Sequence, residues 1–173
     1  MDFYKILRQQ DNIKAPFYKL LEANSYILGN EPSSFAIRYN PEAYNNFLRD
    51  EVIFQNYLKS SIKQLFVTNQ KFITILKNED FFDLELVNCK FDEGTIDSFL
   101  YEDEELSVEV IEELLRRNDY RISEAVCVTR EGKQIRLQKN GVIGFDENLN
   151  KDEHSNLMNL MDTLNCGLKV LRV

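Results

Sequence analysis

The chain has 173 residues, of which 43% are hydrophobic, 12% aromatic and 29% charged, with six glycines and three prolines. This composition excludes a disordered tail, a collagen-like repeat and a low-complexity linker. No apolar run reaches the roughly 18 residues that a membrane span needs, and the N-terminus lacks the basic-then-apolar order of a signal peptide. We therefore expect a cytoplasmic protein without membrane contact.

Charge is distributed unevenly along the chain, whose formal net charge is −8. Residues 1–78 hold ten Lys/Arg and seven Asp/Glu, and residues 114–173 hold ten and eight. Between them lies the acidic segment, residues 79–113, with fourteen Asp/Glu and a single base, Lys90. Phenylalanine and tyrosine residues are interleaved with these carboxylates, so the segment differs from a plain acidic tail.

The N-terminal part of the chain, residues 1–70, is predicted to be mainly helical. Asp2 and Pro16 suit the starts of two short helices within the range 1–25. A short strand is predicted over residues 34–39. Asn40-Pro41 is a typical helix start, and the apolar residues from Tyr44 to Phe66 recur at spacings of three, four and seven. This pattern predicts one long helix over the range 41–66 that forms the centre of the core.

Residues 71–91 are predicted to be strands. Phe72 to Ile75 form one apolar run, and residues 82–86 alternate between apolar and acidic side chains, as in a half-buried strand. A turn follows at Asp92-Glu93-Gly94. Ser107 is then a suitable cap for a helix with glutamates in its first turns and Arg116 and Arg117 in its last.

The last third of the chain predicts a three-stranded meander over residues 122–129, 134–138 and 142–145. Gly132 and Gly141 supply the positive φ that tight hairpins need. A helix is expected over residues 151–164, and a closing strand over residues 168–173. Together these elements predict a single α+β domain over residues 1–173, mostly antiparallel, with helices packed on one face of the sheet. Residues 1–70 form its mainly helical part and residues 71–173 its sheet-rich part.

The sequence lacks the residues that several kinds of catalytic and binding site need. The only histidine, His154, lies in a polar stretch without a nucleophile motif, and no glycine-rich phosphate loop occurs. Cys89, Cys127 and Cys166 lie far apart in the sequence, so we expect buried free thiols rather than a zinc site or a disulfide. We therefore expect no cofactor, no metal ion and no catalytic residue, which favours a protein that is not an enzyme.

One enzymatic alternative stays open, a metal-dependent nuclease or phosphoryl-transfer enzyme. Asp83 and Glu85 on one strand could join Glu131 as carboxylate ligands of Mg²⁺ or Mn²⁺. Against it, Glu131 lies in a predicted tight turn, and Asp83 and Glu85 lie on the predicted solvent face.

The bases around the meander are expected to pair with the acidic segment, within the fold or across a homo-oligomer. They could instead contact phosphates, but the acidic net charge disfavours nucleic acid as a partner. The carboxylates could also have no binding partner and simply form a solvated surface that keeps the protein in solution.

The leading hypothesis is a non-enzymatic binding protein whose acidic and aromatic segment engages a basic protein partner. Nuclease inhibitors, immunity proteins, nucleic-acid mimics and acidic chaperones share this physical profile. The carboxylates would steer the partner and the aromatic rings would anchor it. The residues expected to contact the partner are Asp97, Phe99, Tyr101, Glu102, Asp103, Glu104, Glu105 and Glu109.

Overall fold

The computed structural model of the chain describes residues 1–9, 25–27, 34–59, 62–92, 94–95, 106–117, 119–146 and 148–166. The strands are β1 (Asp2–Gln9), β2 (Ser25–Ile27), β3 (Ser34–Arg38), β4 (Ile62–Gln64), β5 (Leu84–Phe91), β6 (Gly94–Thr95), β7 (Ile122–Thr129), β8 (Gln134–Gln138) and β9 (Val142–Phe145). The helices are α2 (Pro41–Arg49), α3 (Glu51–Lys59), α4 (Asn69–Leu76), α5 (Glu79–Phe82), α6 (Val108–Arg117) and α7 (Lys151–Cys166).

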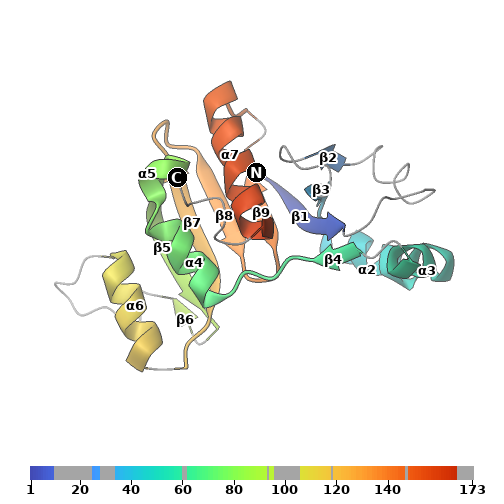
Figure 1. Cartoon of the computed structure of the whole chain (residues 1–173), viewed down its shortest axis with the longest axis horizontal. Helices are drawn as coiled ribbons and strands as arrows, with labels where there is room; N and C mark the ends of the chain where they lie inside the picture. The colour runs from blue at the N-terminus through green and yellow to red at the C-terminus, as the bar shows by residue number, and fades with distance from the viewer. Residues whose placement is uncertain are drawn as a thin grey trace.

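The strands form one sheet in the order β2-β3-β1-β9-β8-β7-β5-β6, and β4 pairs with β1 outside this path (Figure 1). Every strand pairing in the described part of the chain is antiparallel. The α+β class and the antiparallel sheet are therefore confirmed.

The predicted meander is confirmed as β7, β8 and β9, with the predicted bounds. Gly132 and Gly141 have φ angles of +77° and +74° in the two connecting turns. Because L-residues adopt this region at a cost, the two glycines explain why both hairpins can be tight.

Helices α4, α5 and α7 lie in front of the β5–β9 part of the sheet in Figure 1. Leu157, Leu160, Met161 and Leu164 of α7 are buried in the main core, as the spacing of apolar residues in 151–164 predicts. Among the described residues, no helix is both long enough and apolar enough to cross a membrane.

Residues 2–9 form strand β1, so the helix predicted there is wrong. Tyr4 and Ile6 enter the main core, whereas Leu7 enters a second cluster with Ile37 and Tyr44. A strand buried on both faces lacks the polar alternation that identifies a half-buried strand. Without that alternation, the apolar residues of β1 resemble those of a short buried helix.

The single long helix after Asn40 is also wrong, although its start is confirmed. The Asn40 side chain accepts hydrogen bonds from the N–H groups of Glu42 and Ala43 (3.0 and 3.1 Å). The helix ends before Asp50, whose backbone is extended, and α3 follows it. The chain then leaves α3 to form β4, which satisfies the backbone groups of β1 at residues 7–9. Leu58 of α3 is 55% exposed, so the apolar side chains of 41–66 do not form one central core.

The strand predicted from Phe72 to Ile75 is helix α4, in which Phe72, Ile75 and Leu76 are buried at helical spacing. The Thr68 hydroxyl accepts from the Lys71 N–H at 3.4 Å and caps this helix. The second strand is confirmed from Leu84 onward as β5. Its predicted beginning at Phe82 belongs to α5 instead.

Among the described residues of the range 1–70, strands β1 to β4 accompany helices α2 and α3 and the first two residues of α4. The helix predicted near Pro16 and the closing strand 168–173 lie outside the described residues. The helix after Ser107 is confirmed as α6, and the Ser107 hydroxyl accepts from the Val110 N–H at 3.3 Å.

Lys5 of β1 is a charged residue at the centre of the sheet. Its side chain is 3% exposed, donates a hydrogen bond to the Asn140 carbonyl, and lies with Nζ 5.7 Å from the centre of the Phe66 ring. Burial lowers the pKa of Lys5 from its ordinary value of 10.5 to about 8.

This pKa makes the stability of the protein depend on pH in the alkaline range. Between about pH 8 and 10.4 the unfolded chain binds more protons at Lys5 than the folded chain, so stability at this site rises with pH. We expect the unfolding free energy of the wild type, relative to Lys5→Met, to increase by about 3 kcal/mol from pH 7.5 to 10.5. Urea denaturation of both proteins across this range measures it, and a constant difference would contradict it.

Candidate functional site

The structure describes part of the acidic segment. Of the residues expected to contact a partner, Glu109 is described, and it is exposed in the first turn of α6. The others lie outside the described residues: Asp97, Phe99, Tyr101, Glu102, Asp103, Glu104 and Glu105.

Several carboxylates of the acidic segment are paired within the fold. Glu112 of α6 contacts Lys77 at 2.7 Å and Arg116 at 3.7 Å. The hydrogen bond from Lys77 lowers the pKa of Glu112, although partial desolvation opposes it. Glu113 pairs with Arg117, one helical turn along. These contacts give this part of the segment a structural role.

Bases of the meander also pair with the acidic segment. Arg130 lies 2.5 Å from Asp83, and Lys139 lies 2.5 Å from Asp92. The expectation that bases of the meander form ion pairs with the acidic segment within the fold is confirmed for Arg130 and Lys139. Both pairs connect the meander to the α5–β5 side of the sheet.

Three carboxylates without an ion pair in the described part of the chain, Glu79, Asp80 and Glu85, gather with the paired Asp83 where α5 meets β5. We call this surface the acidic corner and define it by Glu79, Asp80, Phe81, Asp83 and Glu85. Its four carboxylates border a hollow of about 220 Å³, together with Leu84, Val128 and Arg130. Glu79, Asp80 and Glu85 are exposed, and only Asp83 has an ion pair there, with Arg130. The hollow therefore has an excess of negative charge.

Local sequence explains the shape of the acidic corner. Asp83 ends α5 with a φ angle of +56°, a left-handed conformation that Asp tolerates better than most residues. This turn starts β5 directly after the helix. Phe82 points into the core, and the neighbouring Phe81, 50% exposed, packs edge-on against it with ring centres 5.0 Å apart. The acidic corner thus combines charge with an exposed and well-supported aromatic ring.

Sequence reasoning placed Glu79, Asp80 and Phe81 in the acidic segment but did not select them as contact residues. The available signal was the pair Asn78 and Asp83, two residues that favour turns, on either side of a short stretch. The predicted solvent face is confirmed for Glu85, which is exposed, whereas Asp83 ends α5 instead of lying on the strand and is 24% exposed in its ion pair with Arg130.

The carboxylates of the metal-enzyme alternative are not gathered at one place. Asp83 and Glu85 line the hollow, whereas Glu131 accepts a hydrogen bond from the Asn150 side chain at 2.8 Å and is absent from its lining. No group of three His, Cys, Asp or Glu side chains within the described ranges is arranged to hold a metal ion.

Lys133, in the turn between β7 and β8, belongs to a partly buried network at the start of α7. Glu153 accepts from Lys133 Nζ at 2.6 Å, Thr129 Oγ1 at 2.7 Å and the Asn150 N–H at 2.8 Å. The Asn150 side chain accepts in return from the Glu153 N–H at 2.9 Å, which completes a capping box. Burial alone would raise the pKa of Glu153, but these hydrogen bonds outweigh it and lower the pKa.

Cys89 and Cys127 are buried free thiols, as expected. They lie on neighbouring strands, β5 and β7, in the main core. Burial raises the pKa of each thiol to about 12, so both stay protonated near neutral pH. They are core residues in this fold.

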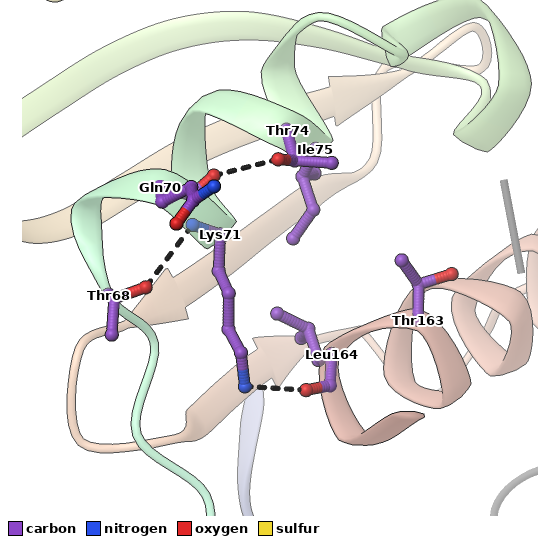
Figure 2. A pocket seen from close by; sticks show the side chains of 7 residues that line it. All are labelled: Thr68, Gln70, Lys71, Thr74, Ile75, Thr163 and Leu164. Atoms are coloured by element: carbon purple, nitrogen blue, oxygen red, sulfur yellow. Dashed lines mark hydrogen bonds between the residues drawn. The ribbon is translucent and has the colours of Figure 1, made fainter. Parts of the chain in front are cut away.

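A second hollow, of about 170 Å³, lies between α4 and α7 (Figure 2). Lys71 is the only charged side chain among its seven lining residues, and its Nζ donates to the Leu164 carbonyl at 2.8 Å. Arg8 donates to the Asn165 carbonyl at 3.1 Å. The two cations therefore cap the C-terminal end of α7, where the helix dipole favours positive charge. Burial, and then the charge of Arg8, lower the pKa of Lys71.

Comparison of the chain with protein-family models, with curated proteins and with solved structures finds no match. Within the described residues, the acidic corner combines unpaired carboxylates with an exposed aromatic ring, that of Phe81.

Proposed function

We propose that this chain is a non-enzymatic, cytoplasmic binding protein that engages a basic protein partner through its acidic and aromatic segment, in the manner of an inhibitor, immunity protein or chaperone. One observation carries the proposal. Glu79, Asp80 and Glu85, exposed and without ion pairs among the described residues, border one hollow, and Phe81, half-exposed, follows Asp80 in α5.

The charge and the ring have different tasks in this proposal. Concentrated like charges repel one another, and a basic partner relieves this repulsion while being steered toward the surface. Aromatic side chains at the centre of an interface supply much of the contact energy. Phe81 is suited to this task because Phe82 holds its ring in place. The contacts predicted at residues 97–105 and at Glu109 belong to the same proposal, as further carboxylates and rings of the acidic segment.

A capture experiment tests the proposal with three forms of the protein. The first is the wild type, and the second carries Glu79→Gln, Asp80→Asn and Glu85→Gln. The third is a matched control with the same change in charge, made at exposed residues elsewhere: Glu42→Gln, Glu51→Gln and Asp152→Asn. At low salt we expect the wild type and the control to retain one discrete basic protein from native lysate, and the second form to lose it.

A further variant tests whether the predicted contact residues after Asp97 contribute to capture as well as the acidic corner. It carries amides at Glu102, Asp103, Glu104 and Glu105, and we expect it to weaken capture as well. If all the forms retain the same proteins, or none retains any, the carboxylates are a solvated surface and the proposal is wrong.

A further inference from the structure

Strand β5 has an outer edge that is only partly paired. It pairs with β7 on one side over its whole length, from Leu84 to Phe91. On the other side, among the described strands, β6 pairs with it at Lys90 and Phe91 alone (Figure 1). Unpaired strand edges are templates for the addition of another strand.

The register shows which backbone groups face this edge. The Thr129 N–H donates to the Lys133 carbonyl on the β8 side at 2.9 Å, so Thr129 and, two residues before it, Cys127 bond toward β8. Leu84 and Leu86 lie opposite these two residues. Because bonding alternates along an antiparallel ladder, Leu84 and Leu86 direct their N–H and C=O groups to the outer edge.

The exposed charge at this edge is that of Glu85, which disfavours the addition of an acidic strand but not of a basic one. Lysine and proline are the residues that usually block an edge, and neither occurs from Leu84 to Cys89. A bulge between Leu86 and Asn88 leaves Val87 49% exposed and limits the regular edge to Leu84–Leu86. The regular edge therefore lies directly beside the acidic corner.

We infer that an extended, basic segment of the partner adds to the sheet as a new strand along Leu84–Leu86. Cross-strand neighbours on one face of a sheet interact, so its Lys or Arg side chains lie against Glu85 and the hollow with Glu79 and Asp80. A second copy of this chain fits less well, because each copy carries a net charge of −8 and pairing would bring two acidic corners toward one edge. The inference rests on the proposed function and adds the mode of recognition.

Two peptides of equal charge test the mode of recognition. One is an octapeptide that alternates lysine with valine, and the other is the same peptide with N-methyl groups on its central residues, which cannot pair as a strand. We expect the first to bind at least about tenfold more tightly, because backbone hydrogen bonds are lost in the second. In free protein the Leu84 and Leu86 amides should exchange hydrogen rapidly and become protected in the complex. The Glu85 amide, which faces β7, should be protected in both states.

The results of the peptide experiment distinguish a failure of strand addition from a failure of the proposed function. If both peptides bind equally and the variant with amides at 79, 80 and 85 binds neither, the acidic corner binds basic segments but strand addition is wrong. If neither peptide binds the wild type at low salt, both proposals are wrong. Slow exchange of the Leu84 and Leu86 amides in the free monomer, or in a dimer detected by light scattering, would show that the edge is already occupied and overturn the inference.

Discussion

Replacing Gly141 by alanine is expected to lower the unfolding free energy by about 3 kcal/mol or more. Gly141 has a φ angle of +74°, and a Cβ there would overlap the Leu65 carbonyl oxygen and lie 2.9 Å from its carbonyl carbon. The turn cannot move away freely, because the Ile6 N–H donates to the Gly141 carbonyl at 2.9 Å. The substitution therefore strains the contact between the meander, β1 and the segment after β4. Urea denaturation measures the loss.

Gly132→Ala is the matched control for this prediction. Gly132 has nearly the same φ angle, +77°, but a Cβ there meets nothing within 4 Å. Only the cost of the left-handed conformation remains, about 1 kcal/mol. Equal losses for the two variants would show that the Leu65 contact has no energetic role.

Glu153→Ala is expected to lower the unfolding free energy by about 3 kcal/mol. The substitution removes the acceptor of Lys133 and Thr129 in a buried site and half of the capping box of α7. It leaves the Lys133 ammonium, which is 24% exposed, without its buried partner. Thermal or urea denaturation near pH 7 measures the change.

Asp152→Ala controls for the loss of one negative charge at the start of α7, since Asp152 is exposed one residue away. We expect this substitution to lower the unfolding free energy by about 0.5 kcal/mol.

The pH dependence of the unfolding free energy supplies a second check on the role of Glu153. Because the folded pKa of Glu153 is lowered, its stabilisation is complete above the unfolded value of about 4.3 and is lost as the pH falls below it. A difference between wild type and Glu153→Ala that persists unchanged in acid would contradict the role of the carboxylate.

The elements that were predicted correctly have local signals. The meander has two glycines at positions that require positive φ, and α2 and α6 have side chains that cap them. Helix α7 has one apolar face. In each case the residues that determine the element lie within a few positions of one another, so the element can be predicted from the local sequence.

The elements that were predicted wrongly depend on distant contacts. Strand β1 is determined by pairing with β3, β4 and β9, all of which lie much further along the chain. The end of the predicted long helix is fixed by the pairing of β4 with β1. The acidic corner depends on the turn at Asp83 and on the approach of Arg130 from the meander. Its charge could be predicted from the sequence, whereas its location could not.

The most direct test of the central claim is the association rate of the captured basic protein as a function of salt. For the wild type we expect the rate to fall by about tenfold or more between low and high salt, since opposite charges accelerate encounter. The variant with amides at Glu79, Asp80 and Glu85 should associate more slowly with a flatter salt dependence, and Phe81→Ala should mainly speed dissociation. An association rate and salt dependence that are the same in the wild type and the amide variant would contradict the claim that the acidic corner receives the partner.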